Sequence, residues 1–255
     1  MKKINIPSLL ESDLAYETGI HIGDGCLSCY GRKNYEICFT GHLIDDLKFY
    51  KEILIPLLKK LFDVKPNLKI VKSKNVCRIK FSSKKLFLFK HKVLHLPVGD
   101  KNKMSSIPEF IFLNSSNMIS FLRGLIDTDG SVKFIAKSKN KRIHYYPQIR
   151  IALKNRIIIQ QILKILKFLD FQCSFYKESY KDERTKRTYS KWCIDLNGKD
   201  NLIKLFEVIK PMNLKHVSKY KIWKKYGFCP PKLNPIQREK IIKNKINPIQ
   251  FYQGL

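Results

Sequence analysis

The sequence lacks any apolar run long enough to cross a membrane as a helix, which requires roughly 18 or more consecutive apolar residues. The first residues, Met1–Pro7, also lack the apolar segment of a secretory signal peptide. We therefore expect a soluble, intracellular protein without a membrane partner. Its compartment is the cytoplasm if the host is a prokaryote, and an organelle is the alternative.

Acidic residues are few. The 255 residues include 21 Asp and Glu against 50 Lys and Arg, a formal net charge of +29. This excess favours nucleic acid as a partner, because cations that neutralise phosphates release condensed counterions. An anionic membrane surface would satisfy the charge equally well, and an AT-rich genome by itself raises the Lys content. The hydrophobic content of 44% excludes wholesale disorder and allows one large domain or two small ones.

A disulfide framework is also absent. The seven cysteines are an odd number and follow no regular spacing, which is typical of a protein from a reducing compartment. Cys26 and Cys29 form a single CxxC pair, and no second pair accompanies them. A structural zinc site is therefore not favoured.

An internal repeat is present instead. Ile6-Pro7 precedes a helical stretch that ends in Gly23-Asp24-Gly25, and Ile107-Pro108 precedes another that ends in Thr128-Asp129-Gly130. The two terminal glycines lie about 105 residues apart, which is the size of a small domain. Each ending is followed by a hairpin, a helix, a second hairpin and a closing helix.

The repeat predicts an α+β fold of two αββαββα units related by a pseudo-two-fold axis. We expect the first unit over residues 1–104, with its connection, and the second over 105–228. Residues 229–255 form a basic tail that has no counterpart in the first unit and no assigned role. The expected strands and helices after the first motif are Cys26–Tyr30, Tyr35–Thr40, Leu47–Leu61, Asn67–Val71, Val76–Phe81 and Lys84–Leu94. Those after the second are Ser131–Lys137, Arg142–Leu153, Ile158–Leu169, Gln172–Tyr180, Tyr189–Leu196 and Asp200–Ile209.

Small residues recur at four-residue spacing on the two repeated helices, which places each set on one helical stripe. The first stripe is Ala15, Gly19 and Gly23, and the second is Ser120, Gly124 and Thr128. Glycine costs up to about 1 kcal/mol per position inside a helix, so the stripes need a reason. We expect them to face each other at the pseudo-two-fold axis, where they let the two backbones approach closely.

Asp24 and Asp129 would then lie side by side at the two helix ends. A carboxylate at a helix C-terminus is disfavoured by the helix dipole, and two of them repel each other. Bound divalent cations would offset both penalties and would suit phosphodiester hydrolysis. For either copy alone, a plain C-terminal turn is the better interpretation, with Gly25 and Gly130 in the left-handed conformation that ends a helix. Two matching copies in a strongly basic protein favour the functional site.

The segment Leu122–Gly130, Leu-Arg-Gly-Leu-Ile-Asp-Thr-Asp-Gly, resembles the signature of the LAGLIDADG homing endonucleases. Gly19–Gly25 resembles the first copy in a two-motif, single-chain member. Leu96–Lys101 and Asn213–His216 are similar to flanking segments of archaeal-type, intron-encoded members. The resemblance covers roughly residues 8–228. The first motif departs from the usual pattern at His21, for which we expect a satisfied polar core position, with a pH-sensitive neighbour of the metals as the alternative.

The resemblance implies a monomer whose units pack through the motif helices, each with a curved antiparallel sheet that lies in the DNA major groove. It implies hydrolysis of one phosphodiester per strand of a long double-stranded target. Mg²⁺, with Mn²⁺ as a substitute, would be bound by Asp24 and Asp129 together with Gly23 and Thr128. A basic residue is expected near the metals at Lys80, whose equivalent in the second unit is Asp195, so the two half-sites should be unequal. Arg150 is a further catalytic candidate.

Alternate side chains on the strands of such a sheet would read bases, and other basic groups would hold phosphates. The candidates are Ser28, Tyr30, Arg32, Lys33, Lys69, Lys72, Arg78, Lys133, Arg142, Gln148, Arg150, Lys177, Lys181, Arg187 and Lys191. Three functions are open: a homing endonuclease, a maturase that binds intron RNA on the same scaffold, and a non-catalytic DNA-binding regulator. The two intact carboxylates favour the endonuclease.

Overall fold

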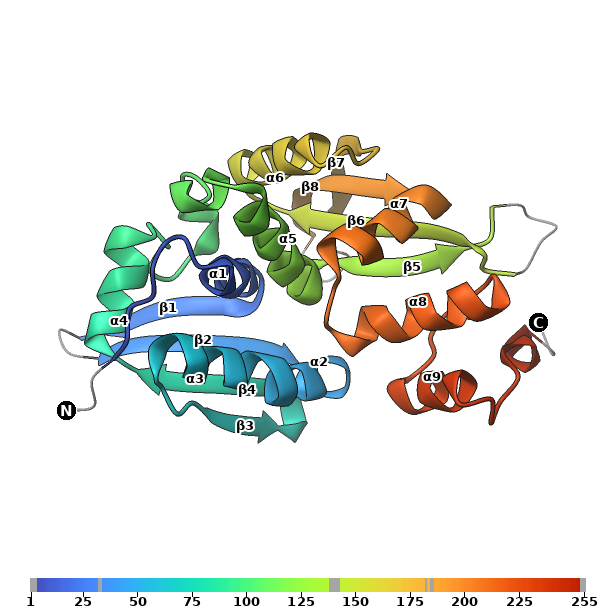
Figure 1. The fold of residues 1–255 in the computed structure, drawn as a ribbon, viewed down its shortest axis with the longest axis horizontal. Coiled ribbons are helices and arrows are strands. Elements are labelled where there is room, and N and C mark those ends of the chain that lie inside the picture. The colour runs from blue at the N-terminus through green and yellow to red at the C-terminus, as the bar shows by residue number, and fades with distance from the viewer. Residues whose placement is uncertain (1–3, 32–33, 138–142, 182, 184–185, 253–255) are drawn as a thin grey trace.

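The computed structural model describes residues 4–31, 34–137, 143–181, 183 and 186–252. Two four-stranded antiparallel sheets lie side by side, and helices pack against both of them (Figure 1). The strand orders are β1-β2-β4-β3 and β5-β6-β8-β7, so the second sheet repeats the topology of the first. The predicted α+β fold with two repeated units is confirmed. The strands are β1 Gly25–Tyr30, β2 Asn34–His42, β3 Asn67–Val71, β4 Val76–Ser82, β5 Ser131–Ile135, β6 Tyr146–Leu153, β7 Ser174–Lys181 and β8 Thr188–Asn197.

The helices of the two repeats follow the predicted order, whereas the helix Leu214–Tyr226 was not predicted. The described α-helices are α1 Ser12–Asp24, α2 Leu43–Phe49, α3 Ile55–Phe62, α4 Lys84–Leu88, α5 Ser115–Asp129, α6 Arg156–Phe168, α7 Lys199–Lys204, α8 Leu214–Tyr226 and α9 Pro235–Ile242. Three predicted helices contain a π-helical turn, at Tyr50–Leu54, Phe89–Val93 and Leu205–Ile209. Among the described residues no helix is both long and apolar enough to cross a membrane. The unit boundaries at residues 104 and 228 stay predictions.

Helices α1 and α5 cross at the centre of the molecule, with their small-residue stripes in contact (Figure 1). A methyl group added at Gly19 would lie 2.1 Å from the carbonyl oxygen of Phe121, and one at Gly124 would lie 2.2 Å from that of Tyr16. No real side chain tolerates such distances, so only glycine permits this approach. The predicted packing of the two stripes is confirmed.

The glycines that end these helices are not left-handed, contrary to the prediction. Gly25 has φ −82° and ψ 160°, and Gly130 has φ −71° and ψ 151°, so both are extended. Glycine occurs at both positions because a side chain would not fit there. A Cβ atom at Gly25 would lie 2.6 Å from the carbonyl oxygen of His21, and one at Gly130 would lie 2.5 Å from that of Ile126. At each of these glycines the chain therefore turns directly from the helix into the first strand of the sheet.

A buried ion pair lies in the first unit. Both Oε atoms of Glu17, on α1, accept hydrogen bonds from Lys90 Nζ at 2.6 and 2.5 Å, and both side chains are fully buried. Burial lowers the pKa of Lys90, and the carboxylate of Glu17 opposes that shift. The pair matters because removing one partner leaves a charge without compensation in the core.

We expect Lys90→Met to lower the free energy of unfolding by about 3–5 kcal/mol, because it leaves Glu17 unpaired. The double variant Glu17→Leu with Lys90→Met removes both charges and should recover most of that loss. Urea denaturation followed by circular dichroism measures both. A Lys90→Met protein as stable as the unmodified one would contradict the expectation.

The C-terminal segment folds onto both units. Helix α9 packs on α8, and Arg238 Nη2 of α9 donates to Asp45 Oδ1 of α2 at 3.1 Å. Near the end of the described chain, the Tyr252 hydroxyl accepts from the backbone N–H of His144 at 3.1 Å. The tail therefore contacts both units.

Candidate active site

The ends of α1 and α5 bring the two predicted carboxylates together. A Cβ atom at Gly23 would lie 2.0 Å from Thr128 Oγ1 and 3.5 Å from Asp129 Cγ, so the carboxyl group of Asp129 adjoins the end of α1. Asp24 is the next residue on that helix. The pair lies where the first strands of the two sheets begin.

Asp24 is held by the first unit. The hydroxyl of Tyr50 donates to its Oδ2 atom at 2.8 Å. Burial, and next the charge of Asp46, raise the pKa of Asp24 to about 7, against the opposing hydrogen bond from Tyr50. Partial desolvation also raises the pKa of Asp129, although the residue keeps an exposed face, while the charges of Lys101 and Lys215 oppose this shift. A site that raises carboxylate pKa values favours a bound cation, because the cation restores the charged form.

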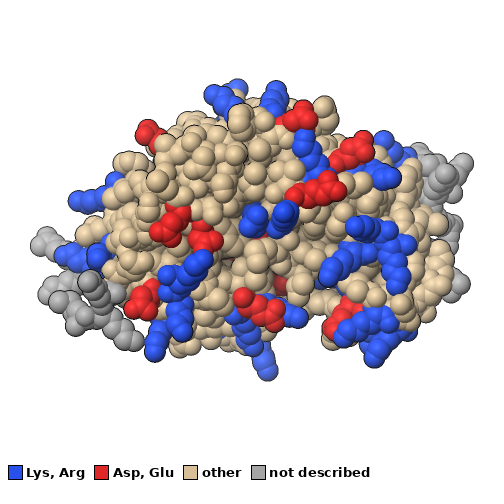
Figure 2. Space-filling view, in the orientation of Figure 1, with Lys and Arg blue, Asp and Glu red and all other residues tan. Residues whose placement is uncertain are grey.

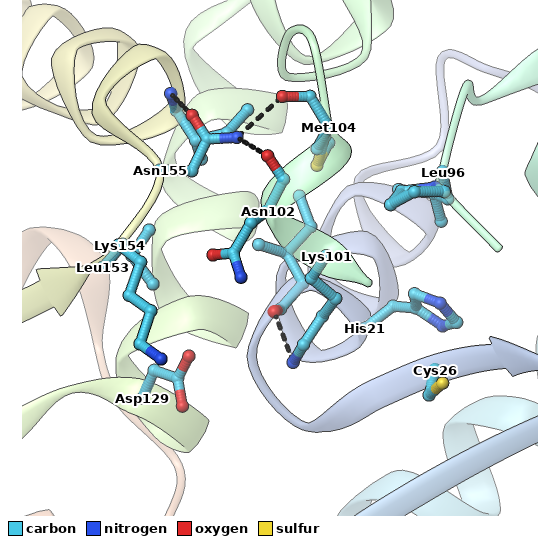
Figure 3. Close-up of a pocket in the computed structure, with 13 residues that line it drawn as sticks. His21, Cys26, Leu96, Lys101, Asn102, Met104, Asp129, Leu153, Lys154 and Asn155 are labelled. Atoms are coloured by element: carbon cyan, nitrogen blue, oxygen red, sulfur yellow. Dashed lines mark hydrogen bonds between the residues drawn. The ribbon is translucent and has the colours of Figure 1, made fainter. Parts of the chain in front are cut away.

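Two lysines reach this site from segments that follow each unit. Lys101 Nζ donates to the carbonyl of Ile22 at 3.0 Å and also to that of Gly23. Lys215 Nζ donates to the carbonyl of Thr128 at 2.8 Å. Each lysine thus binds the residue immediately before one catalytic candidate, in a pseudo-symmetric arrangement. Lys101 and Asp129 line the same pocket, which is drawn in Figure 3.

Asp127 explains how Lys215 reaches its position. This carboxylate is fully buried in α5, and its Oδ1 atom accepts the backbone N–H groups of Met212 and Asn213, each at 2.8 Å. Burial raises the pKa of Asp127 to about 6, and the hydrogen bond from Asn213 is the largest opposing effect. Asp127 therefore anchors the start of the segment that carries Lys215. The first unit has Ile22 at the equivalent position, so its lysine is held differently.

Asp46, which opens α2, is a third acid near the pair. Lys215 Nζ donates to its Oδ1 atom at 3.1 Å, and Asn213 Nδ2 donates to the same atom at 2.8 Å. No role for Asp46, Tyr50, Lys101 or Lys215 was predicted from the sequence. The segments Leu96–Lys101 and Asn213–His216 carry part of the family resemblance, but nothing in their spacing shows that the two lysines return to the motif helices.

The donor set suits a hard cation. Two carboxylates and the carbonyls of Gly23 and Thr128 are all oxygen donors, which Mg²⁺, Mn²⁺ and Ca²⁺ prefer. Over the described part of the chain, no three His, Cys, Asp or Glu side chains gather into a metal-binding group.

His21 is buried, as predicted, but it is not satisfied. Its Nδ1 atom has no hydrogen-bond partner among the described residues. Burial first, and then the charges of Lys90 and Lys101, hold its pKa well below the ordinary value, so the ring is neutral. The ring packs edge-on against Phe39, with centroids 5.4 Å apart.

The two other catalytic candidates lie on the open faces of the sheets, away from the helices. Cys38 pairs with Cys26, and Arg150 pairs with Ser131, each two residues after a motif carboxylate. Register places Lys80 opposite Cys38 and Asp195 opposite Arg150. The predicted equivalence of Lys80 and Asp195 is therefore confirmed. Lys80 forms an ion pair with Glu36.

Arg150 is bound by acids of its own sheet. Its Nε and Nη2 atoms donate to the two Asp195 oxygens at 2.7 and 2.9 Å, and its Nη1 atom lies 3.4 Å from Glu178 Oε2. No contact between described residues joins Lys80 or Arg150 to Asp24 or Asp129. Lys101 and Lys215 are the lysines whose charges act on Asp129, and the catalytic roles of Lys80 and Arg150 stay predictions.

Most candidate DNA contacts share the open faces, because alternate residues of a strand point to the same side. Register places Ser28, Tyr30, Lys69 and Arg78 on the open face of the first sheet, and Lys133, Gln148, Arg150 and Lys191 on that of the second. Their contact with DNA stays a prediction.

Lys177 and Lys181 were placed on the wrong face. Register puts Lys177 opposite Trp192, on the side that packs toward α6, and Lys181 has the same parity. A shift of one residue moves a side chain to the other face, and the sequence alone did not determine that parity. Lys72 lies in the turn between β3 and β4, and Arg187 lies between β7 and β8. Arg32, Lys33 and Arg142 lie outside the described residues.

Comparison with known proteins agrees with this geometry. Residues 116–210 match the family model of the LAGLIDADG-like domain. This match lies within the second repeat. No curated protein sequence matches the chain significantly.

The fold of the whole chain is that of the LAGLIDADG homing endonucleases. I-DmoI, solved with DNA and calcium, matches with a TM-score of 0.54 and 20% identity over 79% of this chain and 91% of its own. I-GzeII, solved with its DNA target, matches with a TM-score of 0.52 and 12% identity over 94% of both chains. I-AabMI, bound to uncleaved DNA, matches with a TM-score of 0.50 and 13% identity over 91% of this chain and 98% of its own.

Proposed function

We propose that this chain is a homing endonuclease that hydrolyses one phosphodiester in each strand of a long double-stranded DNA site. One observation carries the proposal. Asp24 and Asp129 end two helices that pack glycine against backbone, between the open faces of two repeated sheets. The solved relatives bind DNA with the same fold, and the charge of +29 suits that partner. One chain supplies both units, so the proposed enzyme acts as a monomer, inside the cell.

A divalent cation, Mg²⁺ or Mn²⁺, would be held by Asp24 and Asp129 with the carbonyls of Gly23 and Thr128. When bound, such an ion activates water and stabilises charge on phosphate oxygens. Tyr50 fixes the orientation of the Asp24 carboxylate. The ammonium groups of Lys101 and Lys215 lie at the same helix ends and stabilise the negative charge that develops on the scissile phosphates.

The test of this function is cleavage of a defined plasmid. If the reading frame lies inside an intron, the plasmid carries the joined exon sequence that flanks the insertion point. Purified protein should linearise this plasmid with Mg²⁺ or Mn²⁺, and excess EDTA should stop the reaction. Specific binding without cutting in either metal would favour the regulator, and binding of the intron RNA alone would favour the maturase.

The lysines provide a sharper test of the site. We expect Lys215→Met and Lys101→Met each to slow cleavage by about a hundredfold or more, because each removes a cation that lies beside the two carboxylates, where negative charge would develop. Affinity for uncut DNA in Ca²⁺ should change little by comparison. Lys224→Met, an exposed substitution on the same helix as Lys215, is the matched control. Equal cleavage rates for all three variants would remove both lysines from the mechanism.

A further inference from the structure

A second hollow opens where the C-terminal segment meets both units. It has a volume of about 420 Å³, opens to solvent, and lies between the end of β2, strand β5, helix α8 and the residues that lead into α9. The segment Cys229–Pro235 forms one wall, and Arg238 of α9 lies behind it. Lys and Arg side chains gather over α8 and α9 on the face shown in Figure 2.

The lining of this cavity is cationic. Lys133, Lys219, Lys232 and Arg238 line it, and Asp45 is the one acidic residue among its described lining residues. Asp45 is already bound, because it accepts from Arg238 Nη2 at 3.1 Å. None of the three lysines forms an ion pair with a described residue, although the charge of Asp45 acts on Lys219 and that of Asp195 lies near Lys133.

Two of these cations are withdrawn from solvent, since Arg238 is buried and Lys219 is half-buried. Arg238 is only 4% exposed, and its Nε atom has no hydrogen-bond partner among the described residues. Lys219 Nζ donates to the backbone carbonyl of Val132 at 3.0 Å, and burial, with the nearby Arg238, lowers its pKa. A buried cation is costly unless anions compensate it. Asp45 compensates Arg238 only in part, and a bound anion would offset the remaining cost.

The cavity borders both DNA-facing surfaces. His42 ends β2 with the same parity as Thr40 and Cys38, so it belongs to the open face of the first sheet. Lys133 pairs with Gln148 on the open face of the second sheet. Both His42 and Lys133 line the cavity. A duplex that lies across both sheets would therefore pass over its mouth.

We propose that this cavity binds a backbone phosphate of the DNA target, which makes the C-terminal segment 229–252 part of the DNA-binding surface. The inference rests on the proposed function and extends it to residues outside the LAGLIDADG-like repeat. Phosphate is the shared chemistry of two sources, a DNA backbone and a free inorganic ion. The continuity of the cavity with both open faces favours the DNA backbone.

The test compares salt dependence of DNA binding. The probe is a fluorescently labelled duplex selected from a random library by the intact protein, measured in Ca²⁺ at several salt concentrations. Lys232→Gln lies on an exposed loop and removes one charge without disturbing the core, and Lys219→Gln with Lys232→Gln removes two. Lys164→Gln, an exposed change on α6, is the matched control.

We expect the double variant to bind about tenfold more weakly, with a salt slope reduced by about 0.9 for the lost phosphate contact. Lys232→Gln should show the same direction with a smaller effect, and Lys164→Gln should match the unmodified protein. Unchanged affinity and slope in both cavity variants would overturn the inference, even if the unmodified protein cuts DNA. A second outcome would also overturn the inference. If all variants bind the duplex equally, but only the unmodified protein binds inorganic phosphate, the cavity is a site for a small anion and not for DNA. Failure of the proposed function shows separately, as a selected duplex that no protein cuts.

Discussion

Asp24→Asn and Asp129→Asn are each expected to abolish double-strand cleavage while DNA binding persists. Each change removes one carboxylate from the proposed cation site and leaves the shape of the site unchanged. Loss of about 4 kcal/mol of transition-state stabilisation, the order that a metal ion supplies, slows the reaction about a thousandfold. Affinity should hold or rise slightly, because a neutral amide repels phosphate less than a carboxylate does. Linearisation of a plasmid in Mg²⁺ and gel-shift titration in Ca²⁺ measure the two effects.

The matched control is Asp63→Asn, in an exposed left-handed turn after α3 that asparagine also favours. It should cut at the rate of the unmodified protein. Nicking of one strand in either active-site variant would show that the two half-sites act separately. Full cleavage by the variant that carries both substitutions would rule out the proposed mechanism.

Gly19→Ala and Gly124→Ala are expected to destabilise the whole molecule. A Cβ atom at Gly19 would meet the Phe121 carbonyl at 2.1 Å, and one at Gly124 would meet the Tyr16 carbonyl at 2.2 Å. Backbone cannot rotate away as a side chain can, so the helices must separate. Overpacking of this kind costs about 3 kcal/mol or more, although alanine by itself favours a helix. At roughly 2–4 °C per kcal/mol, the melting temperature should fall by about 6–12 °C.

Cleavage should fall with stability, because separation of α1 and α5 also moves Asp24 away from Asp129. Ser120→Ala is the control. It changes the same stripe of α5 without adding volume, and we expect it to melt within about 2 °C of the unmodified protein. A Gly19→Ala protein with an unchanged melting temperature would show that the two stripes do not pack together in solution.

Much of the architecture followed from local patterns. The Asp-Gly endings and the order of hairpins and helices are visible within short windows, because strand and helix periods repeat over a few residues. So is the four-residue spacing of the small residues around Gly19 and around Gly124. These patterns predicted the repeat, the packing of α1 on α5 and the adjacency of Asp24 and Asp129. The predicted left-handed ends at Gly25 and Gly130 were wrong, because the reason for glycine there is a close contact within the helix end.

The sequence also did not determine which face of a sheet each strand residue points to. Ser28 and Arg78 share the open face of the first sheet, whereas Lys177 lies on the covered face of the second. Strand ends predicted from composition carry errors of a residue or more, and one residue reverses the direction of a side chain. Only the pairing of β7 with β8 determined which lysines face outward.

The two carboxylates at the centre were thus determined by the sequence, and their surroundings were decided by the tertiary structure. Lys101 bonds to α1 across 78 residues, and Lys215 bonds to α5 across 87. The cationic cavity joins β2 and β5 to a tail that has no counterpart in the first unit. Contacts over such separations depend on how whole units pack, so no local period encodes them. Asp24 and Asp129 could be found because each ends a copy of the same short pattern. The positions of the two lysines and the cavity arise only when the whole chain is folded.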